Sequence, residues 1–81
     1  MEIEIITRRG CSACEQTKRI LTNHNIAYRE TVIEEDVQRS DVVARFPDRK
    51  KLPIILVNSS IVEGPKELQL LLERDQLGHV A

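Results

Sequence analysis

The hydrophobic pattern of the chain changes its period at Cys11, and this change limits the possible folds most. Residues 2–6 alternate acidic and apolar side chains and end in an apolar pair, which is typical of a β-strand. After Cys11, residues suited to a buried helix face recur three and four positions apart: Cys14, Thr17 and Leu21. This helix should run to about His24. A strand followed directly by a helix begins a β-α-β unit, in which the two strands are parallel and the crossover is right-handed.

The next segment predicts a second strand and a second helix. Residues 26–33 are rich in Val, Ile, Thr and Tyr, which strands favour. The acidic run 34–36 suits the N-terminus of a helix, where the dipole favours negative charge. We expect this helix to continue to about Arg45 and to end before Pro47. Its apolar side should carry three residues: Val37, Val43 and Phe46.

The last third of the chain predicts a hairpin and a final helix. Residues 53–57 form a continuous apolar run, as in a strand that is buried on both faces. The turn-forming residues 58–60 follow, and residues 61–62 can return as a short antiparallel strand. Gly64-Pro65 should open the last helix, and Gly78 should end it. The buried stripe of this helix should consist of leucines: Leu68, Leu71 and Leu72.

These elements give the order β-α-β-α-β-β-α in an α/β protein. We expect a mixed four-stranded sheet flanked by three helices. A chain of 81 residues is too short to build a second core, so residues 1–81 should form a single domain.

Charge and composition exclude several classes of protein. Twelve basic and thirteen acidic residues give a net charge of −1, without the basic excess of a nucleic-acid-binding protein. The aromatic residues, Tyr28 and Phe46, are too few for a platform that stacks single-stranded nucleic acid. Residues 1–6 carry no secretion signal, and the longest apolar run, 52–57, is far shorter than the ~20 residues that span a bilayer. We therefore expect a cytoplasmic monomer that binds neither nucleic acid nor a membrane.

Cys11 and Cys14 form a C-x-x-C motif where the first strand passes into the first helix. A disulfide between them closes almost no loop, so it could add little stability as a structural bridge. The helix N-terminus, together with Arg8 and Arg9, should favour the thiolate of Cys11 and lower its pKa below the usual ~8.5. Cys14 lies one turn deeper, on the buried face. This asymmetry suits thiol–disulfide exchange, with Cys11 as nucleophile and Cys14 as resolving thiol.

Two alternatives for the cysteine pair are open at this point. A C-x-x-C pair can be half of a zinc site, but structural zinc needs four ligands and the chain has no second pair. The two cysteines could also be unrelated buried thiols in a reduced cytosol. The strand–C-x-x-C–helix context favours redox chemistry over both alternatives, so no metal is expected.

Three segments are informative when they are taken together. They are Thr7-Arg8-Arg9-Gly10-Cys11-x-x-Cys14, then Leu52-Pro53 before the third strand, and Glu63-Gly64-Pro65-Lys66-Glu67-Leu68 at the last helix. In this order they resemble the glutaredoxin branch of the thioredoxin-fold superfamily over essentially the whole chain. The resemblance implies a small dithiol glutaredoxin with a thioredoxin-like fold and a redox-active Cys11–Cys14 disulfide. It also implies a cis peptide bond before Pro53, beside the active site.

The resemblance further implies glutathione as co-substrate and suggests its contacts. Arg8 would face a glutathione carboxylate, and Leu52, beside Pro53, would pair with the tripeptide backbone as an added strand does. Gly64 and the N–H groups after it would receive the γ-glutamyl carboxylate at a helix N-terminus. Ala13 would flank the tripeptide. From the charge pattern, we also expect basic residues to converge on the Cys11 face: Arg8, Arg9, Arg49, Lys50 and Lys51.

The chain departs from the family pattern at two of these places. Ser12 and Ala13 stand where the family commonly has Pro-Tyr, so the aromatic ring that would flank glutathione is missing. Lys66 stands where the family usually has an Asp that meets the glutathione ammonium, and Lys66 would repel it. Glu67, the next residue, offers a compensating negative charge.

Three functions are therefore open. The first is glutathione-linked reduction of protein disulfides or mixed disulfides, with ribonucleotide reductase as a candidate substrate. The second, which Ala13 and Lys66 favour, is a hydrogen donor for ribonucleotide reductase that thioredoxin reductase recycles. The third belongs to another class: a binding module that holds an iron–sulfur cluster between two subunits through Cys11 and a glutathione thiolate.

Overall fold

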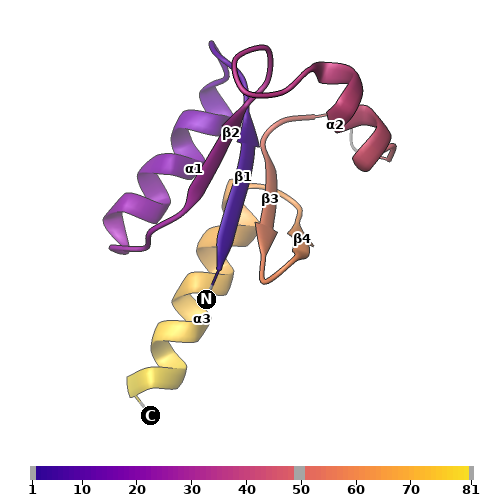
Figure 1. The fold of residues 1–81 in the computed structure, drawn as a ribbon. Helices are drawn as coiled ribbons and strands as arrows, with labels where there is room; N and C mark the ends of the chain where they lie inside the picture. Colours follow the sequence, from indigo (N-terminus) through magenta and orange to yellow (C-terminus); the bar gives the residue numbers. More distant parts are fainter. Residues whose placement is uncertain (1, 49–50, 81) are drawn as a thin grey trace.

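A computed structural model describes residues 2–48 and 51–80 of the chain, with residues 75–80 described by their backbone only. Strands and helices follow one another in the predicted order β-α-β-α-β-β-α (Figure 1). The elements are β1 (Ile3–Thr7), α1 (Ser12–Asn23), β2 (Arg29–Val32), α2 (Arg39–Arg45), β3 (Ile54–Val57), β4 (Ser60–Val62) and α3 (Pro65–Val80). None of the helices in the described part of the chain combines the length and apolar character needed to cross a membrane.

The four strands form one mixed sheet in the order β2-β1-β3-β4. Strand β1 pairs with β2 in parallel, which confirms the predicted β-α-β unit around α1. Strand β1 also pairs with β3, and β3 with β4, in antiparallel register. Strands β3 and β4 form the predicted hairpin, in which Val57 lies opposite Ser60. Strand β1 is therefore an inner strand, paired with β2 on one side and with β3 on the other, and Cys11 follows shortly after its C-terminal end.

The apolar residues of the sheet divide between its two faces. On one face, Ile5 and Ile55 pack in a cluster with Leu21 of α1 and Leu68 of α3. On the other face, a smaller cluster joins the sheet to α2: Ile6, Ile33, Val42 and Ile54. Figure 1 shows this division, with α1 and α3 on one side of the sheet and α2 on the other. The alternation of side chains along each strand produces it, because neighbouring residues point to opposite faces.

The start of α2 differs from the sequence prediction. The acidic residues 34–36 form a turn instead of the first turn of the helix, which begins at Arg39. In this turn the Asp36 carboxylate accepts a hydrogen bond from the Val32 backbone N–H at 2.9 Å. The Glu34 N–H donates to the Val37 carbonyl at 2.7 Å. An Asp side chain that bonds the nearby backbone offers the chain a turn that competes with a helix, and here the turn forms.

The later start of α2 also changes which valine is buried. The prediction of Val43 on the apolar side was wrong, because Val42 is 8% exposed and Val43 is 51% exposed. Val37 and Phe46, by contrast, pack against the smaller cluster as expected. A helix of seven residues presents little more than one position to the sheet, and Val42 occupies it.

Two further boundaries differ from the sequence predictions. Strand β2 is shorter than the predicted 26–33, although Ile26 and Tyr28 still pack against the larger cluster. Helix α3 continues through Gly78 to Val80, so Gly78 does not end it. A glycine inside a helix costs roughly 1 kcal/mol relative to alanine and does not by itself end a helix. The predicted leucine stripe of α3 is confirmed, since Leu68 and Leu72 are buried and Leu71 is half-buried.

Candidate active site

Cys11 lies between the end of β1 and the start of α1 and forms the N-cap of this helix. Gly10 precedes it with φ +75°, a left-handed conformation that other residues rarely adopt. Cys11 itself has an extended backbone, and its Sγ accepts a hydrogen bond from the Cys14 backbone N–H at 3.2 Å. The sulfur thus takes the place that a capping hydroxyl or carboxylate usually has. In the reduced protein this N–H favours the thiolate over the thiol, because it is a donor aimed at the charge.

The two cysteines form a disulfide, with 5.2 Å between their Cα atoms. Their environments differ as the sequence predicted: Cys14 is fully buried, and Cys11 is partly exposed at the surface. Next to Cys14 on the buried face, the Thr17 hydroxyl donates to the Ala13 carbonyl at 2.9 Å, which satisfies a polar group inside the core. A substrate at the surface can therefore contact the sulfur of Cys11. The sulfur of Cys14 is buried, and its main exchange partner is the sulfur of Cys11.

The Leu52–Pro53 segment lies directly beside Cys11, although it is 41 positions away in the sequence. The peptide bond between these residues is cis, as the resemblance implied. The Cys11 Sγ is 3.9 Å from the Leu52 carbonyl oxygen. Strand β3 begins only at Ile54, so the half-buried Leu52 and the buried Pro53 lie just before the point where the chain enters the sheet.

Two cavities open on either side of this segment. The Gly64 cavity, of about 400 Å³, lies toward the start of α3 and is lined by residues including Ala13, Leu52, Pro53, Gly64 and Pro65. The α2 groove, of about 940 Å³, lies toward α2 and is lined by residues including Arg8, Cys11, Arg39, Val43, Lys51 and Leu52. The two cavities share Leu52, Lys51 and Ile54.

The predicted site residues are therefore distributed over two adjoining cavities. Ala13, Leu52, Pro53 and Gly64 line the smaller one together. Arg8 lies with Cys11 in the larger one and meets the others only through Leu52. Glu34, Arg39 and Val42 also line the α2 groove and were not expected from the sequence. Their position depends on where α2 packs, and no local pattern of the sequence signals it.

The predicted basic residues near Cys11 differ in the charge that they offer. The Arg9 guanidinium binds the Glu35 carboxylate through two hydrogen bonds, from Nε at 2.6 Å and from a terminal nitrogen at 2.9 Å. This pairing raises the pKa of Arg9 and lowers that of Glu35. Arg9 is thus neutralised by its partner, while Arg8 and Lys51 line the groove with no ion pair to a described residue. Arg49 and Lys50 lie outside the described residues.

A polar network that the sequence did not reveal fixes α1 to the sheet near the cysteines. The buried Thr7 hydroxyl, at the end of β1, donates to Glu30 of β2 at 2.6 Å. The Lys18 ammonium of α1 lies 3.2 Å from the same Glu30 oxygen and 3.0 Å from Glu15. The hydrogen bond to Glu15 is the main cause that raises the pKa of Lys18. The network ties β1, β2 and α1 together below the helix N-terminus that carries Cys11.

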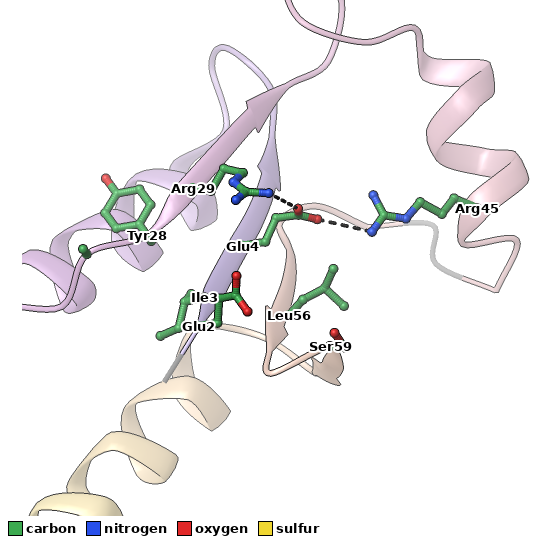
Figure 2. Close-up of a pocket in the computed structure, with 9 residues that line it drawn as sticks. Glu2, Ile3, Glu4, Tyr28, Arg29, Arg45, Leu56 and Ser59 are labelled. Atoms are coloured by element: carbon green, nitrogen blue, oxygen red, sulfur yellow. Dashed lines mark ion pairs between the residues drawn. The ribbon is translucent and has the colours of Figure 1, made fainter.

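A third cavity, of about 470 Å³, lies near the other end of β1. Figure 2 shows Glu4 in this cavity between two arginines, Arg29 of β2 and Arg45 of α2. The Glu4 oxygens lie 4.0 Å from Arg29 and 3.4 Å from Arg45. The Arg45 pair connects α2 to β1, and the Arg29 pair connects β2 to β1. None of the predicted site residues lines this cavity, and the cysteines follow the opposite end of β1.

Among the side chains of residues 2–48 and 51–74, no group of three or more His, Cys, Asp and Glu is placed to hold a metal ion. The candidate active site consists of the cysteine pair, the Leu52–Pro53 segment and the two cavities.

Several solved structures share this fold. Glutaredoxin 1 from Francisella tularensis, in a complex with cacodylate, has a TM-score of 0.78 and 26% identity, covering 93% of this chain and 95% of that one. A glutaredoxin from Brucella melitensis has a TM-score of 0.67 and 25% identity, covering 99% and 87%. The NrdH-redoxin from Escherichia coli, a glutaredoxin-like protein, has a TM-score of 0.72 and 23% identity, covering 91% and 93%. The last likeness concerns the fold alone.

The sequence comparisons give a family. No curated protein matches the chain significantly. The family model described as Glutaredoxin matches residues 3–62, which contain both cysteines and the Leu52–Pro53 segment. Because this match covers most of the chain and the thioredoxin-like fold agrees with it, the chain belongs to the glutaredoxin family and is a thiol–disulfide oxidoreductase.

Proposed function

We propose that the protein reduces disulfides by a dithiol mechanism in which Cys11 is the nucleophile and Cys14 the resolving thiol. One observation supports this assignment above all: the Cys14 N–H donates to the sulfur of Cys11, while the sulfur of Cys14 is buried below it. The helix N–H group that the Cys11 sulfur caps thus stabilises negative charge on the accessible sulfur. A thiolate at Cys11 and a neutral thiol at Cys14 are the starting state that exchange requires.

The reaction then proceeds in two displacements. The Cys11 thiolate attacks one sulfur of the substrate disulfide, the substrate S–S bond breaks, and the departing sulfur takes the electron pair and a proton from water. A mixed disulfide now joins Cys11 to the substrate. Cys14 loses its proton and attacks the Cys11 sulfur, which releases the second substrate thiol. The substrate has gained two electrons and two protons, and the protein ends as the Cys11–Cys14 disulfide.

We propose glutathione as the reductant that restores the dithiol. Two glutathione molecules supply the two electrons and leave as glutathione disulfide. The Gly64 cavity is suited to the γ-glutamyl carboxylate, because Gly64 and Pro65 bring the N-terminus of α3 to its wall. Leu52, shared by both cavities, offers its backbone to the cysteinyl residue. Arg8 in the α2 groove supplies a cation for the carboxylate at the other end of the tripeptide.

A second reductant, thioredoxin reductase, has its own support. Lys66 is exposed at the second position of α3, beside the wall of the Gly64 cavity, and there it repels the glutathione ammonium. Among the described residues that line this cavity, Ala13 is present and none is aromatic. The solved NrdH-redoxin, described as having a thioredoxin-like activity profile, shares the fold. In this alternative the protein is a hydrogen donor whose partner is ribonucleotide reductase.

We further propose that the protein works as a monomeric single domain in the cytoplasm. Reduced thiols persist there, so a dithiol of this kind can cycle between its two states.

A pair of coupled assays separates the two reductants. Consumption of NADPH is followed with hydroxyethyl disulfide as substrate, once with glutathione and glutathione reductase, and once with thioredoxin reductase alone. We expect activity in the first assay, and activity in the second assay alone would contradict the glutathione assignment. Cys11→Ser should abolish the activity in both. Cys14→Ser should keep only the glutathione-dependent reaction, because glutathione can replace Cys14 as the resolving thiol. Full activity of Cys11→Ser would contradict the mechanism itself.

A further inference from the structure

The α2 groove is larger than the Gly64 cavity, and the contacts proposed for glutathione use only Arg8 and Leu52 of its lining. It begins at Cys11 and extends between the turn at residues 34–36 and α2. One wall carries the Arg9–Glu35 ion pair. The other wall is α2, which packs against the sheet through Val42 and is joined to β1 by the Arg45–Glu4 ion pair (Figure 2). The groove is thus a built feature that extends beyond the cysteines.

The floor and rim of the groove are apolar. Ile33, Val42 and Ile54 form the floor and are at most 8% exposed. Val43 lies at the rim and is 51% exposed, which makes it one of the exposed large apolar residues of the described chain. When an apolar side chain of a partner contacts Val43, the apolar surfaces of that side chain and of Val43 are both removed from water. This burial is favourable.

The charge of the groove differs in sign from that of the whole chain. Arg9 and Glu35 neutralise each other, which leaves three cations and one carboxylate on the lining. The three cations are Arg8, Arg39 and Lys51, none of them in an ion pair with a described residue, and the carboxylate is Glu34. The chain as a whole has a net charge of −1. A concave, locally positive surface on a weakly negative protein attracts negative partners selectively.

The shape of the site favours an extended chain. Leu52 lies outside β3, between the groove and the Gly64 cavity, and its carbonyl is next to Cys11. A polypeptide whose cysteine sulfur is bonded to Cys11 can run alongside Leu52 as an added strand does, with alternate side chains directed into the groove.

We propose that the α2 groove is a docking site for an extended polypeptide segment of the substrate, with acidic residues and an apolar residue next to its reactive cysteine. The proposal rests on the disulfide reductase function above and names the substrate class for it. Arg39 and Lys51 select the acidic residues, and Val43 contacts the apolar one.

The test uses single turnover of the reduced protein, so that no reductase takes part. The substrates are two synthetic tetrapeptides, acetyl-Asp-Asp-Leu-Cys-amide and acetyl-Lys-Lys-Leu-Cys-amide, each as a mixed disulfide with 2-mercaptoethanol. Hydroxyethyl disulfide is the matched substrate without a peptide. In each reaction the protein dithiol supplies both electrons and becomes the Cys11–Cys14 disulfide. Acid-quenched samples, separated by chromatography, give the second-order rate constants.

We expect the acidic peptide to react about tenfold faster than the lysine peptide at low salt, because electrostatic attraction raises association rates by 10-fold or more. The ratio should shrink as salt rises, since the screening length falls to about 10 Å at 0.1 M. Equal rates for the two peptides, with normal reaction of hydroxyethyl disulfide, would overturn the docking proposal alone. Failure to reduce hydroxyethyl disulfide as well would overturn the proposed function.

Two variants assign the effect to the groove. Arg39→Glu should bring the ratio of the two peptide rates close to one, whereas Arg19→Glu, the same charge change on α1 at the other face of the sheet, should keep the wild-type ratio. Arg39 is the first residue of α2, where a glutamate is favourable for the helix, so the fold should persist. If both variants lower the ratio equally, the selection arises from net charge and the groove is not the docking site.

Discussion

Replacing Leu68 by alanine tests how strongly the packing of α3 stabilises the sheet and the active site on it. Leu68 is fully buried in the larger cluster, among residues of β1, β3 and α1. Its backbone N–H donates to the Gly64 carbonyl at 2.9 Å, a bond that alanine retains. The substitution therefore removes only side-chain packing. Leu70, on the same helix, is 46% exposed and gives a matched control with the same chemical change.

The expected cost follows from the difference in burial. Truncation of a buried leucine to alanine costs about 2–5 kcal/mol, so we expect about 3 kcal/mol for Leu68→Ala. At the half-exposed Leu70 the same truncation should cost at most about 0.5 kcal/mol. Both variants gain the same small helix propensity, which cancels in the comparison. In a domain of this size, 3 kcal/mol corresponds to a fall in Tm of about 12–24 °C.

Urea unfolding followed by far-ultraviolet circular dichroism measures both variants, since the chain has no tryptophan and a single tyrosine. The oxidised form should be used throughout, so that the redox state is the same in every sample. We expect a lower midpoint with an unchanged slope for Leu68→Ala, which indicates lost stability and the same unfolded surface. Equal midpoints for the Leu68 and Leu70 variants would refute the reasoning, because burial would then not decide the cost.

Three further predictions concern the site. Lys66→Asp should lower the KM for glutathione several-fold in the coupled assay, because it replaces a repulsive charge near the Gly64 cavity. The control variant Arg74→Asp, farther along α3, should leave the KM unchanged. An unchanged KM in both variants would mean that glutathione binds elsewhere. Glu35→Gln should reduce the free energy of unfolding at neutral pH, since Arg9 lowers the pKa of Glu35 from its ordinary 4.5 and the pair stabilises the folded protein above that value. This difference from wild type, measured by urea unfolding, should vanish as the pH falls through the lowered pKa, and a difference that grows in acid would contradict the ion pair. In the reduced protein, iodoacetamide at pH 7 should modify Cys11 at least about tenfold faster than Cys14, because only Cys11 is exposed and bonded by an N–H donor. Mass spectrometry of the peptides checks this, and equal rates would remove the basis for the two roles.

The pattern around Cys11 could be interpreted from the sequence because it depends on local physics. The change of period from strand to helix, the glycine before the cysteine and the position of Cys14 one turn later all concern neighbours in the chain. The same holds for Gly64-Pro65, since a proline at the first turn of α3 loses no hydrogen bond. The order of all seven elements followed from such signals.

The start of α2 shows where local signals fail. Acidic residues favour both a helix N-terminus and a turn, so residues 34–36 allowed two interpretations. The Asp36 carboxylate bonds the Val32 N–H and Glu35 binds Arg9, 26 positions away, and these contacts select the turn. With the start of α2 shifted, Val42 replaced Val43 in the core, and Val43 was left exposed beside the groove.

The sequence by itself determined the order of elements, the cysteine pair at the mouth of α1 and the exposure of one sulfur relative to the other. Each depends on periodicity, capping and backbone conformation over a few residues. Only the tertiary structure decided that Leu52 lies against Cys11, that Arg8 and Gly64 line separate cavities, and that Glu35 neutralises Arg9. The two contacts, Arg9–Glu35 and Cys11–Leu52, join residues 26 and 41 positions apart, and they exist because α2 and β3 pack against β1, which no local pattern specifies.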